Sequence, residues 1–237
     1  MLLIHMIKVA MITYTPIKTI LYLILMVTGL KGEIMTNESY ADIQLRAANL
    51  APYASEMDSV YHSLFKSGPA GDFITNIMGQ ETHYGSPISG YDPTNMYSMG
   101  LTQVDPVRYQ DLLNDYAKSS VYKDRIDRVN QYMQSKPGYE DWDMTKLATI
   151  TDGKYSNMSK YASDPLSNMM LTRMLLMKDP NPIPQDIVGQ AGVWKNIWNT
   201  LSGMGNITEF TDKYNDFRSV DATMQKNANI QNAFTGP

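Results

Sequence analysis

The chain has 237 residues, which is enough for one good hydrophobic core and a small appendage. A formal charge of −4 without a basic stripe disfavours binding to nucleic acid. The absence of cysteine excludes disulfides, thiolate nucleophiles and cysteine-based zinc sites. The three histidines, His5, His62 and His83, show no paired-ligand spacing, so we expect neither a metal nor another cofactor.

The first part of the chain differs in composition from the rest. Residues 1–34 are rich in Ile, Leu, Met and Val. Their longest uncharged run, Thr19 to Leu30, is shorter than the roughly 20 apolar residues that span a bilayer, so we expect no stable membrane span. The run fits the hydrophobic region of a signal peptide. In the alternative interpretation translation starts at Met35, because Lys31-Gly32-Glu33 can be encoded by a purine-rich ribosome-binding site, and the leader then has no role.

Helical patterns dominate the remainder. Apolar residues at helical spacing, with proline and glycine as stop signals, predict helices over 41–50, 57–65, 72–84, 106–118, 121–133, 164–177, 187–201 and 207–217. Pro52 is expected to separate the first two, and turn formers predict a loop over 85–98. We therefore expect a mainly α, single domain over 35–224, with room for one small β-hairpin within 85–105. A mobile Asn/Gln-rich tail is expected over 225–237.

One glutamate continues the apolar stripe of a predicted helix. Ile74, Ile77 and Met78 mark that stripe, and Glu81 follows them on the same face. Burial and the negative end of the helix dipole both disfavour a carboxylate, so the pKa of Glu81 should rise. A protonated glutamate in a cleft can act as a general acid. The alternative is a glutamate exposed at a frayed helix end.

A short turn motif follows further along the chain. Gly100 permits close backbone approach, Leu101 is expected to be a buried anchor, and Gln103 can hydrogen-bond a sugar hydroxyl or N-acetyl group. Taken alone, the motif also fits a turn that leads into the helix opened by Pro106. Together with Glu81, it predicts a cleft that combines a carboxylic acid with a substrate-gripping turn.

With these two motifs the chain resembles the lytic transglycosylases, the goose-type-lysozyme-like (SLT domain) branch of peptidoglycan-cleaving enzymes. Glu81-Thr82 matches the family's catalytic Glu-Ser, with Thr in place of Ser. The segment Ser98-Met99-Gly100-Leu101-Thr102-Gln103-Val104-Asp105-Pro106 matches its Gly-Leu-Met-Gln-type motif. The resemblance covers about residues 70–215.

A third family motif, of the type Tyr-Asn-Ala-Gly, is matched less closely. The segment from Asp164 to Asn168 is similar to the family's helix that precedes this motif. Trp198-Asn199 is the better candidate for the motif itself, with Trp in place of Tyr. Tyr214-Asn215 competes for the place, although no glycines follow it.

The resemblance implies a lysozyme-like fold and one reaction. Glu81 would protonate the β-1,4 bond between N-acetylmuramic acid (MurNAc) and N-acetylglucosamine (GlcNAc), and would then act as a base so that a 1,6-anhydro ring closes. One carboxylate suffices for such substrate-assisted chemistry. Asp92 and Asp105, the nearest other carboxylates in sequence, are expected to be structural, Asp105 as a helix N-cap. If water enters instead, the site is that of a hydrolytic muramidase.

The expected partner is the glycan strand of peptidoglycan. Besides Glu81, the expected substrate-binding residues are Ser98, Gly100, Leu101, Gln103, Tyr91, Tyr97, Trp198 and Asn199. Trp194 is expected to pack in the core. A signal peptide would favour secretion to the periplasm or cell wall, whereas a start at Met35 would favour a phage virion or tail with tail proteins as partners. The alternative from another class is a non-catalytic virion or wall-binding protein on a degenerate lysozyme-like scaffold.

Overall fold

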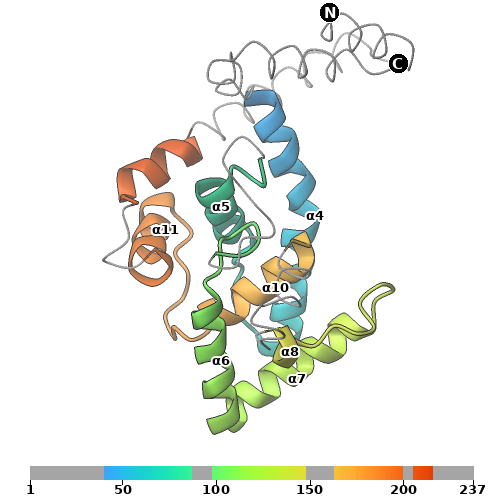
Figure 1. Cartoon of the computed structure of the whole chain (residues 1–237). Coiled ribbons are helices and arrows are strands. Elements are labelled where there is room, and N and C mark those ends of the chain that lie inside the picture. The colour runs from blue at the N-terminus through green and yellow to red at the C-terminus, as the bar shows by residue number, and fades with distance from the viewer. Residues whose placement is uncertain (1–39, 87–97, 148–162, 200–204, 216–237) are drawn as a thin grey trace, which may run out of the picture. The chain divides into compact units, whose positions relative to one another are not determined.

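The structure is a computed structural model that describes residues 40–86, 98–147, 163–199 and 205–215. These residues form helices joined by turns (Figure 1), and none of them forms a β-strand, so the mainly α class is confirmed. Across these ranges, every helix is too short or too polar to span a bilayer. The predicted leader, most of the predicted loop and the predicted tail lie outside the described residues.

Helix α4 (Tyr40–Phe65) is one continuous element where two helices were expected. Pro52 carries no N–H, so it removes one helical hydrogen bond, at a cost of about 3 kcal/mol. Burial outweighs this cost, because the helix buries apolar residues on both sides of the proline, namely Ile43, Leu50, Ala54, Met57, Val60 and Tyr61. The prediction of a break at Pro52 is wrong because tertiary packing overrides the local stop signal.

Helix α5 (Gly71–Thr82) begins against α4. The carboxylate of Asp58, on α4, accepts hydrogen bonds from the N–H groups of Ala70 at 2.7 Å and of Gly71 at 3.0 Å. It therefore satisfies backbone donors at the start of α5 from outside that helix. Gly71 lies where the two helices meet, and a Cβ there would be 3.0 Å from the carbonyl oxygen of Ala54. The position of α5 thus depends on this glycine.

The next helices follow the sequence pattern closely. Helix α6 (Pro106–Lys118) spans the predicted residues. Asp105 caps it, as predicted, by accepting from the N–H of Val107 at 2.8 Å. Helix α7 (Ser120–Gln134) extends the predicted range by one residue at each end, and the short helix α8 (Met144–Leu147) follows.

Helix α10 (Pro165–Leu176) is the centre of the packing. All its residues from Leu166 to Leu176 are buried, and it contacts α4, α5 and α6. A helix buried all round is surrounded by other elements rather than lying on the surface. Its N-cap Asp164 accepts from the N–H of Ser167 at 2.8 Å, which confirms the predicted start. The helix ends at Leu176, one residue before the predicted end.

The segment predicted as one helix over 187–201 has two parts. Helix α11 (Ile187–Val193) is an α-helix, and Trp194–Trp198 (η2) is a π-helix. The N–H of Asn199 donates to the carbonyl of Trp194 at 2.8 Å and closes this wider turn. Such π-turns are rare in proteins as a whole, but those that occur are often found at functional sites. A last helix covers residues 207–215, and the two further residues predicted for it lie outside the described range.

The small hairpin expected within 85–105 is reduced to one contact in the described residues. Met99 and Val104 form an isolated antiparallel bridge. The bridge closes the Gly-Leu-Thr-Gln turn directly before α6 begins.

Replacing Gly71 with alanine should lower the free energy of unfolding by about 2 kcal/mol, because the new methyl group meets a backbone carbonyl and the Asp58 carboxylate. Gly192→Ala in α11 is the matched control. Nothing lies within 4 Å of the Cβ added there, so its better helix propensity should stabilise the protein by about 0.5–1 kcal/mol. Urea unfolding of both variants measures the difference. Equal stability of the two variants would contradict the close approach of α5 to α4.

Candidate active site

The carboxyl group of Glu81 stands at the end of α5 because the helix stops almost directly after it. His83 and Tyr84 both adopt the left-handed conformation, with φ of 46° and 58°. The N–H of Tyr84 donates to the carbonyl of Met78 at 3.1 Å, a bond that closes helix C-termini. The ring of Tyr84 lies over Gly79, where a Cβ would be 2.7 Å from that ring. A glycine inside the helix therefore makes room for the turn that ends it.

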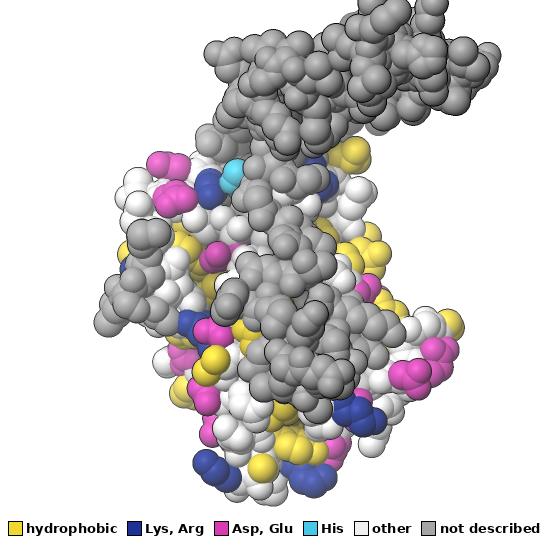
Figure 2. Space-filling view, viewed as in Figure 1, with side chains coloured by type: hydrophobic (Ala, Val, Ile, Leu, Met, Phe, Trp, Pro, Cys, Tyr) yellow, Lys and Arg dark blue, Asp and Glu magenta, His cyan; other side chains and the backbone are white. Residues whose placement is uncertain are grey.

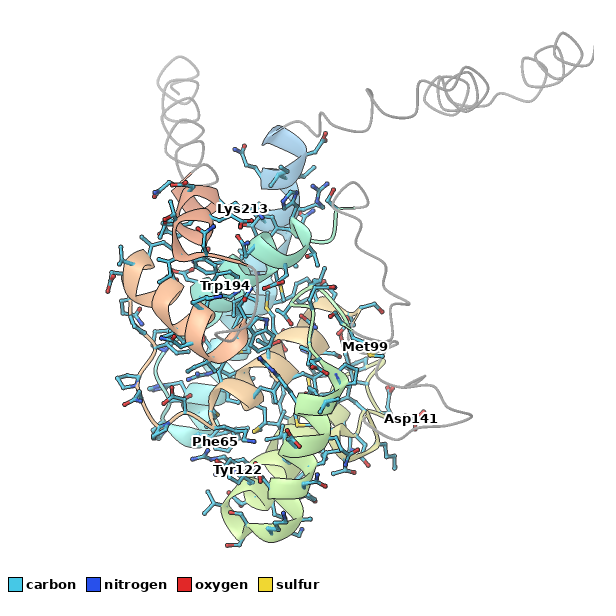
Figure 3. All side chains as sticks on the ribbon, turned by 60° about the vertical axis from the view of Figure 1, so that its left-hand side comes forward. Phe65, Met99, Tyr122, Asp141, Trp194 and Lys213 are labelled. Atoms are coloured by element: carbon cyan, nitrogen blue, oxygen red, sulfur yellow. The ribbon has the colours of Figure 1, made fainter. Side chains whose placement is uncertain are left out.

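Glu81 is half-buried, and a tryptophan holds one of its oxygens. The indole N–H of Trp194 donates to Oε1 of Glu81 at 2.9 Å. Trp194 is 1% exposed and lies in the interior (Figure 3). Its ring stacks on Phe210 with centroids 5.0 Å apart, and Gly205 leaves space for it, since a Cβ there would be 2.4 Å from the indole. The indole that donates to Glu81 is therefore firmly packed. The alternative, in which Glu81 is exposed at a frayed helix end, is wrong.

Burial is the largest influence on Glu81 and raises its pKa above the ordinary value. The hydrogen bond from Trp194 and the positive charges of Lys213 and Arg108 lower the pKa in part, whereas the negative charge of Glu209 raises it. The net effect is a raised pKa, so more of this carboxyl is protonated than that of a glutamate in water at the same pH. A raised pKa suits a general acid.

The last helix supplies two of these charges. Lys213 donates to the carbonyl of Gln80 at 3.2 Å and forms an ion pair with Glu209 at 3.2 Å. The side-chain N–H of Gln80 donates to the same carboxylate at 3.1 Å. Helix 207–215 therefore lies against the last turn of α5.

The Gly-Leu-Thr-Gln turn has a fixed conformation. Met99 and Val104 exchange both backbone hydrogen bonds, at 2.8 and 2.7 Å. Gly100 and Gln103 have φ of 72° and 53°, which a glycine adopts without strain but a glutamine does not. The side-chain N–H of Gln103 donates to the carbonyl of Gly100 at 2.9 Å and helps to hold this conformation.

The hydroxyl of Thr82 joins the end of α5 to this turn. It lies 2.9 Å from the carbonyl oxygen of Leu101 and 3.0 Å from that of Met78, and it accepts from the N–H of Gly85 at 3.0 Å. Its single proton serves either carbonyl. Thr82 is 1% exposed, so this contact is sheltered from water. The threonine in place of serine therefore keeps a hydroxyl that links the two motifs.

Three more side chains hold the middle of the turn. The N–H of Thr102 donates to Oδ1 of Asn168 at 3.2 Å, and its hydroxyl shares a 2.9 Å hydrogen bond with the hydroxyl of Thr172. Both partners lie on α10. The indole N–H of Trp198 donates to the carbonyl of Thr102 at 2.9 Å. The turn is therefore fixed by α10 and by the π-helix at once.

A cavity of about 500 Å³ opens where these elements meet. The side chains that line it are those of Glu81, Ser98, Gln103, Asp105, Arg108, Trp198 and Asn199. Five of these were predicted as site residues, and they come from three separate segments of the chain. The third motif candidate, Trp198-Asn199, is thus brought to the same cavity as Glu81.

The other predicted site residues have different places. Gly100 and Leu101 are buried and shape the turn, and neither lines the cavity, so their contact with a substrate stays a prediction. Tyr91 and Tyr97 lie outside the described residues. Trp194 packs in the core, as predicted, but its hydrogen bond to the glutamate was not foreseen.

Arg108 and Trp194 are the site residues that sequence reasoning missed. Arg108 lies in the first turn of α6, donates to the carbonyl of Ile197 at 2.9 Å and sits 5.9 Å from the ring centroid of Trp198. The one sequence signal for Arg108 is its position in the first turn of the helix that directly follows the turn motif. For Trp194 the signal is its spacing of four residues from Trp198, which puts both indoles on one side of a helical segment.

Surface charge and metal-binding geometry add little to this site. On the face seen in Figure 2, lysine and arginine side chains are scattered among acidic ones rather than gathered into a stripe. Within the described ranges, no group of three or more His, Asp or Glu side chains is placed to hold a metal ion.

Comparison of the chain with protein-family models, with curated proteins and with solved structures finds no match.

Trp194→Phe should raise the pKa of Glu81 further, because it removes a donor that stabilises the carboxylate and keeps an aromatic ring against Phe210. An NMR titration of the Glu81 side-chain carboxyl measures the change. Trp142→Phe is the control, since its buried indole donates to Ser167 at 3.1 Å and its loss should lower stability without moving that pKa. An unchanged or lower pKa in Trp194→Phe would show that the bond does not stabilise the carboxylate.

Glu81→Gln should stabilise the protein increasingly as pH rises. Because the pKa of Glu81 is raised on folding, the folded state binds this proton more tightly than the unfolded state, whose pKa is near 4.5. The stabilisation from this group is complete below the unfolded pKa and is lost as pH rises through the folded pKa. Glutamine keeps the acceptor for Trp194 without a charge. Melting temperatures of both proteins across the acidic to neutral range test this, and a difference independent of pH would refute it.

Proposed function

We propose that this protein is a peptidoglycan lytic transglycosylase with a lysozyme-like fold, which cleaves the β-1,4 bond between MurNAc and GlcNAc. One observation carries the proposal. A half-buried glutamate with a raised pKa, held by an indole N–H, lines a cavity that the Gly-Leu-Thr-Gln turn also lines. The motif resemblance of Glu81-Thr82, residues 98–106 and Trp198-Asn199 supports the same function.

In the first step, protonated Glu81 gives its proton to the glycosidic oxygen. The bond from that oxygen to C1 of MurNAc breaks, and the GlcNAc fragment leaves with a free hydroxyl. The acetamido group of the substrate stabilises the positive charge that develops at C1, which is why a second protein carboxylate is not required. Burial of Glu81 favours this step because it keeps the acid protonated.

In the second step, ionised Glu81 acts as a base. It takes the proton of the C6 hydroxyl of MurNAc while that oxygen attacks C1, so a 1,6-anhydro ring closes and Glu81 regains its proton. No water is consumed and no cofactor is used. The hydrogen bond from Trp194 stabilises this carboxylate, so it favours the proton release of the first step.

The remaining polar groups of the cavity would hold the sugars. Ser98, Gln103 and Asn199 offer hydroxyl and amide groups, and the indole of Trp198 offers an apolar surface beside them. The side-chain N–H of Gln103 is engaged by Gly100, but its amide oxygen has no partner among the described residues and can accept from a sugar hydroxyl.

Hydrolysis is the second candidate reaction, and the place of Asp105 favours it. This carboxylate is exposed and lines the same cavity, although it also caps α6. In inverting glycosidases a second carboxylate activates water while the first protonates the leaving oxygen. Asp105 would then be the base of a muramidase, whereas in the transglycosylase it serves only as a cap.

The proposed setting depends on the leader. A signal peptide in residues 1–34 would place the enzyme in the periplasm or cell wall. A start at Met35 would place it in a phage virion or tail, where tail proteins are its partners. A non-catalytic virion or wall-binding protein on the same scaffold is the competing class, and retention of the packed, hydrogen-bonded Glu81 argues against it.

Incubation of the full chain with purified peptidoglycan should release muropeptides with 1,6-anhydro-MurNAc ends, identified by mass spectrometry. Glu81→Gln should reduce their release at least about 100-fold, because it removes the acid and base of the reaction. Glu140→Gln, an exposed carboxylate that accepts from the N–H of Gly138, is the matched control and should leave the rate unchanged.

The products decide among the candidates. Reducing MurNAc ends that disappear in Asp105→Asn would establish hydrolysis in place of ring closure. If the peptidoglycan stays intact although circular dichroism shows that the protein is folded, both enzymatic reactions are excluded and the non-catalytic class remains.

A further inference from the structure

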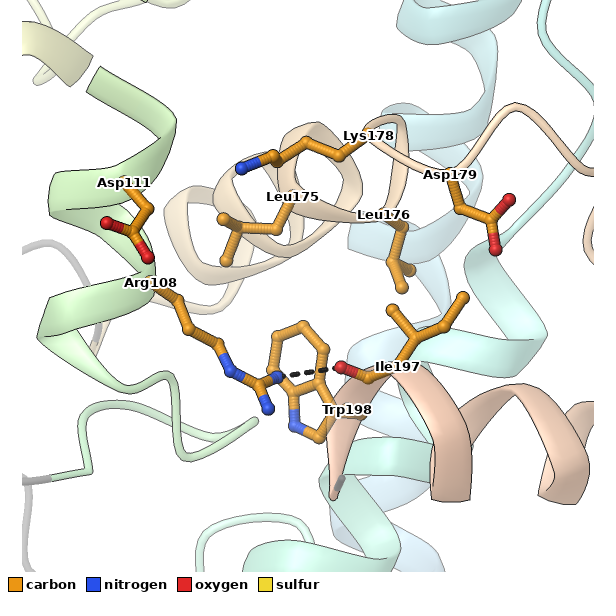
Figure 4. A pocket seen from close by; sticks show the side chains of 8 residues that line it. All are labelled: Arg108, Asp111, Leu175, Leu176, Lys178, Asp179, Ile197 and Trp198. Atoms are coloured by element: carbon orange, nitrogen blue, oxygen red, sulfur yellow. Dashed lines mark hydrogen bonds between the residues drawn. The ribbon is translucent and has the colours of Figure 1, made fainter. Parts of the chain in front are cut away.

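A second cavity, of about 220 Å³, lies beyond Arg108 and Trp198 (Figure 4). These two residues line both this cavity and the active-site cavity, so the two cavities are adjacent. The other side chains that line the second cavity come from α6, from the end of α10 and the turn that follows it, and from the π-helix: Asp111, Leu175, Leu176, Lys178, Asp179 and Ile197.

The inner surface of this cavity is apolar. Leu175, Leu176 and Trp198 are 8%, 4% and 7% exposed, and Ile197 is half-buried beside them. Such a surface binds an aliphatic chain. A cavity of roughly 150 Å³ suffices for benzene. This volume therefore accommodates one long side chain rather than a disaccharide.

The charges at the rim of the cavity determine which charged group the end of a bound aliphatic chain can carry. Lys178 forms an ion pair with Asp115, whereas Arg108 donates to the neutral carbonyl of Ile197 and keeps its positive charge. Asp179 accepts two hydrogen bonds from Asn181, at 2.9 and 2.8 Å. Asp111 has no hydrogen bond or ion pair with any described residue and is exposed at the rim. Because Lys178 and Asp115 neutralise each other, the carboxylates of Asp111 and Asp179 outnumber the guanidinium of Arg108 by one, so the rim has a net negative charge that favours a cation.

We propose that this cavity binds the side chain of the diamino acid in the peptide stem of peptidoglycan. Its methylene groups would lie on Leu175 and Leu176, and its terminal ammonium beside Asp111. The inference rests on the proposed function, because the stem is attached to the MurNAc unit next to the scissile bond. In the acceptor stem of a cross-link the same amine is an amide without charge, so the cavity favours stems whose amine is free.

Calorimetric titration of the full chain carrying Glu81→Gln, which removes turnover, tests this. The probes are three GlcNAc–MurNAc oligosaccharides of equal length: one with lysine-containing stems, one with the lysine amine acetylated and one without peptide. The free-amine probe should bind about three- to fivefold more tightly than the acetylated one. A further Asp111→Asn change should abolish that preference and leave the affinity for the peptide-free probe unchanged.

Asp124→Asn is the matched control, because it removes the same charge from α7, beside a different cavity, and should keep the preference. Equal binding of the two peptide probes, or a preference that survives Asp111→Asn, overturns the proposal. Cleavage of the peptide-free glycan by the unaltered chain is measured in parallel. If the glycan is cleaved but the free-amine and acetylated probes bind equally, only the assignment of the second cavity is overturned. If none of the three probes binds, the proposed function is overturned as well.

Discussion

Two indole N–H groups from a single π-turn hold the candidate active site together. Trp194 donates to the carboxyl of Glu81, and Trp198 donates to the backbone carbonyl of Thr102. The end of α5 and the Gly-Leu-Thr-Gln turn therefore share one anchor, and the hydroxyl of Thr82 links them directly. Both indoles are buried, so loss of an acceptor would leave a buried donor unpaired, at a cost of about 1–3 kcal/mol. The cavity keeps its shape because its parts are bonded to one another and to the core.

Helix α10 extends this constraint into the core. An all-apolar buried helix could rotate or slide with little penalty, whereas buried polar side chains fix one position. Asn168 and Thr172 bind the Gly-Leu-Thr-Gln turn, Ser167 accepts from Trp142, and Arg173 donates to the carbonyl of Gly68 at 3.0 Å. Gly68 lies just before α5. One helix thereby sets the positions of both motifs, although it contributes only its last residues to a cavity.

The sequence was most informative where the signal is local. The helix over 106–118 was predicted at its observed bounds because Asp105-Pro106 is a cap followed by a first-turn proline. The break predicted at Pro52 is wrong because burial on both sides of a proline is a tertiary effect. The motif pattern also pointed to Glu81, Gln103 and Trp198, which line one cavity. The bond from Trp194 could not be predicted, because a hydrogen bond between distant segments leaves no periodic trace in the sequence.

The same bond bears on how one glutamate can serve as acid and then as base. A carboxyl in a purely apolar pocket keeps its proton but cannot easily release it. Trp194 donates to Oε1, so it offsets part of the burial effect and stabilises the ionised form. Oε2 has no hydrogen bond with any described residue, so it is the oxygen free to carry the transferred proton. In the proposed reaction, the tryptophan that eases ionisation therefore also selects the oxygen that meets the substrate.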